Sequence, residues 1–235
     1  MHREKTATRD HRFSTETELA APVEAWLAFM GSTCVGREVE VGFGIPDLVG
    51  GVGTRSALRN RRRQARPVTQ ALHLAVLDFC QTSRSEAELR EWAPNGFSEL
   101  NRRALKPLLS FGMLSTQNNR LRARVAPKDP FERIIAVELK LADATRGLAQ
   151  AYAYRAFADV SYLALPARRV IPELMDRARA IGVGLLAVHR ELVEEIVEPD
   201  SDSYATAGRR RMASEYTMAA HADAAARTAG APRRH

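Results

Sequence analysis

Three charged side chains interrupt otherwise apolar, strand-like segments of this sequence. Glu138 and Lys140 belong to the aliphatic run 134–141, and Asp47 follows a proline in the run 45–50. Side chains alternate along a strand, so Glu138 and Lys140 should project from one face and their aliphatic neighbours from the other. Burying a carboxylate and an ammonium group together among aliphatic side chains is energetically costly, which indicates a functional role for the pair.

Two carboxylates and a lysine that converge could bind a hard divalent cation and help water attack phosphorus. Mg²⁺ prefers oxygen ligands and keeps several waters, and a lysine can orient the nucleophile or stabilise developing charge. Other interpretations stay open. Asp47 could be a turn residue after proline, and Glu138 and Lys140 could be a solvent-facing pair on a strand with one buried side.

The surrounding pattern predicts the elements that would position these residues. A helix should begin at Ser14 or Thr15 and end at Gly31, before two short strands over 38–41 and 45–50. From residue 127 onward the order is strand, helix, strand, helix, strand, which favours an α/β domain with a mainly parallel or mixed sheet. The expected ranges are 134–141, 143–157, 160–165, 171–180 and 183–188.

Pro46-Asp47 followed by Glu138-Leu139-Lys140 resembles the signature of the PD-(D/E)XK nuclease superfamily. Gln150 and Tyr154 resemble its QxxxY element, although two residues four apart on a helix could equally be packing residues. The resemblance covers 14–54 and 127–198. It implies a restriction-endonuclease-like mixed α/β sheet flanked by helices, and a Mg²⁺ or Mn²⁺ cofactor held by Asp47 and Glu138.

Members of this superfamily often add a glutamate from the first helix, and three candidates compete here. At about 100° per residue, Glu16 lies near the centre of the apolar stripe that must face the sheet. Glu18 points away from that stripe, and Glu24 lies at its edge. We therefore expect Glu16 to support the metal.

Asp47 and Glu138 are 91 positions apart, which exceeds what a connection between strands needs. The excess, 55–126, reads as an inserted domain of three helices and a hairpin, which resembles a winged helix-turn-helix. Ser85 and Glu88 form a capping-box pattern ahead of the helix 86–92. The next helix, 97–111, would be the recognition helix.

Seven residues of this insert are candidates for DNA contacts. They are Asn101, Arg102, Arg103 and Lys106 on the recognition helix, and Arg120, Arg122 and Arg124 on the wing. Winged helices also serve as protein-interaction modules, and the arginine-rich run 55–66 could be a flexible linker.

The distribution of charge favours a polyanionic partner. Residues 55–126 hold 14 Lys and Arg against 5 Asp and Glu, whereas the rest of the chain is slightly acidic. Of the 35 basic residues only four are lysines, a bias that a GC-rich genome can also produce. Two cysteines are too few for a disulfide framework, the apolar runs are too short to cross a membrane, and a cytoplasmic location is expected.

The leading hypothesis is a Mg²⁺-dependent DNA nuclease whose core is interrupted by a winged helix. Lys140 would assist the attacking water, and Gln150 would position substrate or metal. The alternative is a DNA-binding regulator with an inactive nuclease-like core; a protein-interaction scaffold has the least support. Expected partners are DNA and, as an open alternative, a second copy of the chain. Residues 1–13 and 199–235 should be disordered tails, although 212–227 could form a marginal helix.

Overall fold

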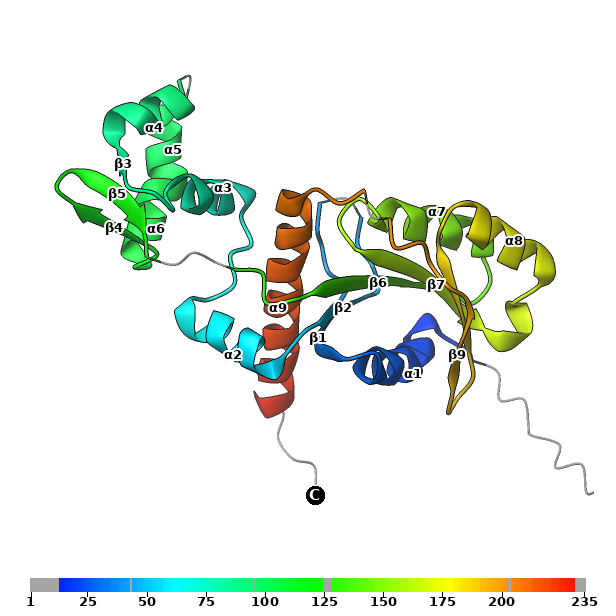
Figure 1. Cartoon of the computed structure of the whole chain (residues 1–235). Helices are drawn as coiled ribbons and strands as arrows, with labels where there is room; N and C mark the ends of the chain where they lie inside the picture. The colour runs from blue at the N-terminus through cyan, green and yellow to red at the C-terminus, as the bar shows by residue number, and fades with distance from the viewer. Residues whose placement is uncertain (1–12, 43, 95, 125–127, 203, 231–235) are drawn as a thin grey trace, which may run out of the picture.

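The computed structural model describes residues 13–42, 44–94, 96–124, 128–202 and 204–230. It is a mixed α/β structure in which helices flank a six-stranded sheet, and a smaller unit of short helices and strands stands to one side (Figure 1). Within the described part of the chain, no helix combines the length and the apolar character that crossing a bilayer requires.

The sheet has the strand order β1-β2-β6-β7-β8-β9. The central pairs β6–β7 and β7–β8 are parallel, whereas β1–β2, β2–β6 and β8–β9 are antiparallel. The strands are β1 (Ser32–Arg37), β2 (Leu48–Val52), β6 (Arg133–Leu139), β7 (Val160–Pro166), β8 (Gly184–Val188) and β9 (Val193–Val197). Parallel neighbours need helical crossovers, which α7 (Ala144–Tyr154) and α8 (Pro172–Ala180) supply, the latter after the short 3₁₀ turn Ala167–Arg169.

Helices cover both faces of the sheet, and the alternation along β6 decides which side chains meet which helix. Val137 and Leu139 share a buried cluster with α1 (Glu16–Phe29), while Ile134 and Ala136 face the C-terminal helix α9 (Ala207–Gly230). Glu138 lies two and four positions after Ala136 and Ile134, so it projects from the same face of the sheet, which α7 also covers. Glu138 thus projects from the face opposite Val137 and Leu139, as expected, but it shares its own face with the aliphatic Ile134 and Ala136.

Most of the chain between β2 and β6 forms a unit with a core of its own. The first element, α2 (Arg55–Gln64), instead places Leu58 in the core beside the sheet. The elements of the unit are α3 (Ala71–Phe79), β3 (Arg84–Ser85), α4 (Glu86–Trp92), α5 (Phe97–Leu100), the π-helical turn Asn101–Leu105, α6 (Lys106–Ser110), β4 (Leu114–Gln117) and β5 (Arg120–Ala123). The capping box of α4 and the hairpin are confirmed: Asn118 and Asn119 have φ of 50° and 57°, as a tight two-residue turn requires. Leu77, Leu89 and Leu108 are fully buried within this unit.

One expected strand is wrong. Residues 38–41 are a loop rather than a strand: Glu38 has φ of 49°, and the amides of Glu38 and Val39 donate to the carbonyls of Asp47 and Pro46. Val39 and Val41 are buried among the side chains on the α9 side of the sheet, so their alternation reflects burial of a loop. The strand that pairs with β2 on the side away from β6 is β1, whose sequence STCVGR has no strand-like alternation.

The expectations for the arginine run and for the C-terminal tail are also corrected. Residues 55–64 form helix α2, in which Leu58 and Arg61 are buried, and are not a flexible linker. Residues 207–230 form the 24-residue helix α9, not a disordered tail, because its Ala213 and Met218 fill the core beside β1 and β2. Of the expected loose N-terminus, residues 1–12 lie outside the described part of the structure, and Phe13 is buried beside α1.

Candidate active site

The antiparallel register of β2 and β6 brings Asp47 next to Glu138. Leu48 pairs with Val137, so Asp47, one residue before β2, lies beside the end of β6. Its Oδ2 atom accepts a hydrogen bond of 2.7 Å from the backbone N–H of Leu139. The two acidic residues, 91 positions apart in sequence, are therefore joined through the backbone of the ExK segment.

Glu138 is the buried centre of the cluster. Its side chain is 2% exposed, and Oε1 accepts a hydrogen bond of 2.5 Å from Nζ of Lys140. Its Oε2 atom accepts one of 2.5 Å from the hydroxyl of Tyr154 on α7, and that hydroxyl also lies 3.2 Å from the carbonyl oxygen of Ile45. One carboxylate thus connects β6, α7 and the segment before β2.

Glu16, at the first position of α1, approaches the same end of the sheet. Its Oε1 atom lies 4.0 Å from Nζ of Lys140 and 3.4 Å from the backbone N–H of Leu141, which donates to it. The competing glutamates are engaged elsewhere. Glu18 accepts hydrogen bonds from Ser14, and Glu24 pairs with Arg37. Of the three candidates, Glu16 is the one that reaches Lys140.

The electrostatics of the cluster are those of several carboxylates around one cation. Burial, with added repulsion from Glu138 and Glu16, raises the pKa of Asp47 to about 6, although the Leu139 amide works against this. Burial alone would lower the pKa of Lys140, but the hydrogen bond from its ammonium group to Glu138 and the other nearby carboxylates outweigh it and raise that pKa. Burial and the contact with Glu138 raise the pKa of Tyr154 far above its ordinary value, so this hydroxyl is a proton donor.

Gln150 lies one helical turn before Tyr154 on α7. Its amide oxygen is buried and has no hydrogen-bond partner among the described residues. A buried acceptor without a donor is costly, and such groups in native structures call for an explanation, such as a ligand or an ion. Tyr154 contacts Glu138 through its hydroxyl, and the Gln150 oxygen is an acceptor that a ligand or water could satisfy.

Two glycines that the sequence interpretation did not single out complete the site. A Cβ atom at Gly147 of α7 would lie 2.9 Å from Cγ of Lys140, and one at Gly44 would lie 2.8 Å from Cε1 of Tyr154. Gly44 also has φ of 124°, which other residues rarely adopt. Two sequence features could have indicated these close approaches: a glycine inside a helix, and a pair of glycines, Gly42 and Gly44, just before the proline.

The donor set is compatible with a hard cation but is not a complete cage. No group of three or more His, Cys, Asp or Glu side chains arranged to hold a metal ion occurs among the described residues. Asp47 and Glu138 offer carboxylate oxygens, and the unpartnered Gln150 oxygen adds a neutral one. Mg²⁺ is commonly bound through one or two carboxylates with water at its remaining positions, so these residues fit that ion.

Some of the candidate DNA-binding residues of the insert are already paired with acidic side chains, and others are not. Arg102 and Arg103 lie 2.6 and 3.7 Å from the same carboxylate oxygen of Glu99. Arg120 donates at 2.8 Å to both Glu88 and the carbonyl of Ser83, inside the unit. Lys106, Arg122 and Arg124 are exposed and form no ion pair among the described residues, and the neutral Asn101 is half-buried.

The three histidines in the described part of the structure lie outside the carboxylate cluster. His73 contacts the carbonyl oxygen of Arg103, and His221 the backbone of Val35. His189 lies near Glu194. None of these three contacts a residue of the cluster.

Comparisons with known proteins add little to this geometry. No family model and no curated protein matches the chain. A solved structure described as a protein of unknown function from Silicibacter pomeroyi is similar over 44% of this chain and 69% of that one, with 18% sequence identity and a TM-score of 0.30.

Proposed function

We propose that the chain is a Mg²⁺-dependent DNA nuclease of the PD-(D/E)XK type. The observation that carries the proposal is the convergence of Asp47, Glu138, Lys140 and Glu16 at one end of the sheet. These residues come from three separate segments, yet each contacts another of them or the backbone of the ExK segment. The resemblance in sequence and this geometry support the same assignment.

In this proposal Asp47 and Glu138 would hold the cation, which would supply positive charge to stabilise the phosphate during its hydrolysis. Lys140 orients the attacking water and stabilises negative charge that develops on phosphorus oxygens. Tyr154 donates to Oε2 of Glu138 and so fixes the orientation of the carboxylate, whose Oε1 would be shared between Lys140 and the cation. Glu16 holds water near Lys140, and the Gln150 amide oxygen accepts a hydrogen bond from substrate or from bound water.

The inserted unit resembles a winged helix-turn-helix in its order of helices and hairpin, and we assign it the role of presenting DNA to the core. Its three-stranded sheet, β3-β5-β4, places the hairpin strands beside the short strand that precedes α4. A contact with duplex DNA would therefore combine the helix 97–110 with the hairpin.

The proposal is tested by incubating the full-length chain with supercoiled and linear DNA in Mg²⁺, Mn²⁺ or EDTA. Cleavage should require the divalent cation and should be lost in K140A and D47A. Glu16→Gln should reduce cleavage, whereas its matched control, Glu18→Gln, should not, because Glu18 is bonded to Ser14 instead. Circular dichroism establishes that each variant is folded.

A second candidate function is a DNA-binding regulator with an inactive core. It is favoured by the direct pairing of Lys140 with Glu138 at 2.5 Å, because a lysine that neutralises the carboxylate can serve the fold alone. Tight DNA binding without cleavage in either cation, with K140A binding as well as the native chain, would support this regulator and contradict the nuclease.

A further inference from the structure

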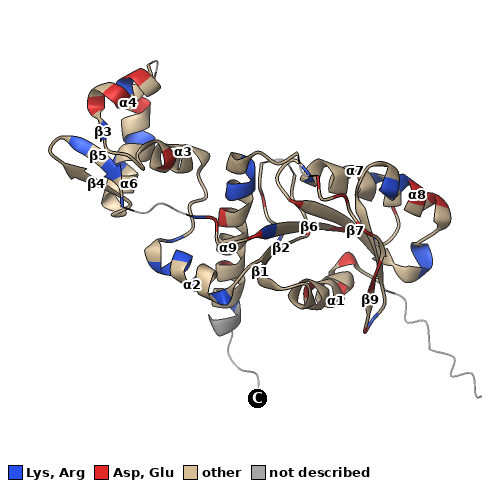
Figure 2. Ribbon diagram, in the orientation of Figure 1, with Lys and Arg blue, Asp and Glu red and all other residues tan. Residues whose placement is uncertain are grey.

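Helix α2 carries a stripe of arginines on its exposed side. Arg55, Arg59, Arg62 and Arg63 are all exposed. Their spacing of four, seven and eight residues from the first places them within an arc of about 100°, since a helix turns by about 100° per residue. Figure 2 shows several basic positions on this helix, which lies beside α9 and below the inserted unit.

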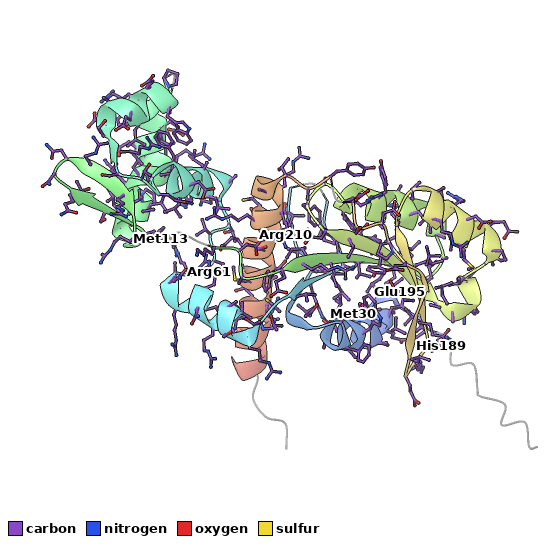
Figure 3. All side chains as sticks on the ribbon, viewed as in Figure 1. Met30, Arg61, Met113, His189, Glu195 and Arg210 are labelled. Atoms are coloured by element: carbon purple, nitrogen blue, oxygen red, sulfur yellow. The ribbon has the colours of Figure 1, made fainter. Side chains whose placement is uncertain are left out.

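The opposite side of α2 is anchored. Leu58 is buried beside the sheet, and Arg61, with a side chain 2% exposed, forms a buried ion pair of 2.6 Å with Glu215 of α9 (Figure 3). Glu215 also accepts a hydrogen bond from the backbone N–H of Val68, where the chain leaves α2. The arginine stripe is therefore fixed in orientation rather than carried on a mobile segment.

The charge of the insert is concentrated in this helix. Residues 55–66 contain six arginines and no acidic residue, whereas 67–126 contain eight basic and five acidic residues. In that second part, Arg84, Arg90, Arg102, Arg103 and Arg120 all lie in ion pairs with glutamates of the same unit. Within the described residues, Arg55, Arg59 and Arg63 are in no ion pair.

The basic surface continues beyond the end of α2. Arg66 is exposed and stacks on the ring of Phe111, with 3.6 Å between the guanidinium carbon and the ring centroid. The two residues line a pocket of about 400 Å³ together with His73 and Arg103. Arg66 thus adds a further exposed positive charge just beyond the end of α2.

We infer that the exposed arginine face of α2 is the principal phosphate-binding surface of the protein and binds the backbone of duplex DNA. This inference rests on the proposed function, in which DNA is the substrate. Unpaired guanidinium groups on a rigid helix can each replace a counterion of the duplex, whereas arginines already paired with glutamate must first break that pair. The winged-helix residues then contribute less to affinity than their number suggests.

The test compares three charge-matched triple variants of the full-length chain. R55Q/R59Q/R63Q removes three of the four arginines of the α2 stripe; Arg62 is kept because its charge acts on the buried thiol of Cys34. R102Q/R103Q/K106Q removes the same charge from the helix 97–110. R168Q/R169Q/R179Q removes it from exposed positions around α8, at the far side of the sheet in Figure 2. Glutamine preserves helix propensity, and melting curves verify folding.

Binding to a labelled duplex is measured across a range of salt concentrations in Ca²⁺ or EDTA, and cleavage is measured separately in Mg²⁺. The native chain should give a steep fall of log K with log salt. The slope of the α2 variant should be smaller in magnitude by about 0.9 for each arginine removed, so by up to about 2.7 for the three. Its affinity for the duplex at 0.1 M salt should be lower by on the order of 100-fold. The variant of helix 97–110 should lose less than half as much slope, and the α8 variant almost none.

The outcomes separate the two proposals. An unchanged slope in the α2 variant, or an equal or larger loss in the variant of helix 97–110, overturns the assignment to α2 while cleavage by the native chain upholds the nuclease. A native chain that neither binds nor cleaves DNA overturns the proposed function and this inference together. If RNA or a protein then binds through α2 instead, duplex DNA is contradicted as the partner.

Discussion

Gly147 of α7 lies against the aliphatic part of Lys140: a Cβ atom at position 147 would be 2.9 Å from Cγ of Lys140 and 2.6 Å from Cδ1 of Leu163. The absence of a side chain at this point lets the helix approach the end of β6 closely. Lys140 is thereby confined between α7 on one side and the carboxylates of Glu138 and Glu16 on the other.

Gly147→Ala should displace Lys140 and lower the rate of DNA cleavage by about tenfold or more, because small errors in catalytic geometry are costly. The fold should survive, since alanine favours the helix and both crowded atoms belong to side chains that can shift. Single-turnover cleavage rates give the readout. Gly208→Ala, where a Cβ atom meets nothing within 4 Å, is the control and should cleave normally.

Asp47→Asn should stabilise the fold while it abolishes cleavage. Burial raises the pKa of Asp47 to about 6, so the folded state binds this proton more tightly than the unfolded chain. The stability that this provides is fully present below about pH 4, the ordinary value of an aspartate, and is lost as the pH rises through about 6. At pH 8 the ionised Asp47 should therefore lower the free energy of unfolding by about 1–2 kcal/mol, a value reduced for solvent screening because the group is partly exposed.

Denaturant unfolding at pH 4 and pH 8 checks this expectation. D47N should gain stability over the native chain at pH 8, and that gain should shrink toward pH 4. The exposed Asp176, 78% exposed at its side chain, provides the control D176N, which should show no such dependence. A gain that is equal at both pH values would show that the charge of Asp47 is not the cause.

Tyr154→Phe removes the hydroxyl that holds Oε2 of Glu138. Loss of a hydrogen bond to a charged acceptor is worth about 1.5–3 kcal/mol, so cleavage should slow by about 10- to 100-fold if the carboxylate must keep this orientation. The effect should fall on kcat more than on KM for DNA. Tyr152→Phe on the exposed side of the same helix should leave both constants unchanged; equal effects of the two variants would contradict a positioning role for Tyr154.

Glu215→Gln should destabilise the protein strongly, because it leaves the guanidinium group of Arg61 buried without its counter-charge. Both side chains are 2% exposed, and breaking such a pair typically costs about 3–5 kcal/mol. Glu86→Gln removes the partner of Arg90 in an exposed pair and should change stability little. Urea unfolding followed by tryptophan fluorescence compares them; similar midpoints would contradict an anchoring role for the buried pair.

The parts of the fold that the sequence predicts are those determined by short-range patterns. The capping box at Ser85 and Glu88, the hairpin of the insert and the opposite projection of Glu138 and its neighbours each involve residues close in sequence, and each is confirmed. The rotation of Glu16 relative to its helix stripe also follows from local geometry, and the structure places it 4.0 Å from Lys140.

What the sequence does not predict depends on distant partners. β1 has no strand-like alternation, and it is a strand because β2 pairs with it on one side and α9 packs across it. From its moderate apolar content, the sequence of α9 predicts a mobile tail. The structure shows instead that its buried Glu215 pairs with Arg61, 154 positions earlier. Nothing in the local sequence of either residue signals the other.

Because α9 comes after every other described element, the order of synthesis matters for how this protein acquires its structure. The inserted unit is complete in sequence at Ala123, but Arg61 of α2 and the outer side of β1 have no α9 to contact until residues 207–230 emerge. At ribosomal rates of 5–20 residues per second this delay is roughly 5–20 seconds. During that interval the nascent chain exposes the apolar side chains that Ala213 and Met218 later cover, so it is a candidate for chaperone binding on the ribosome.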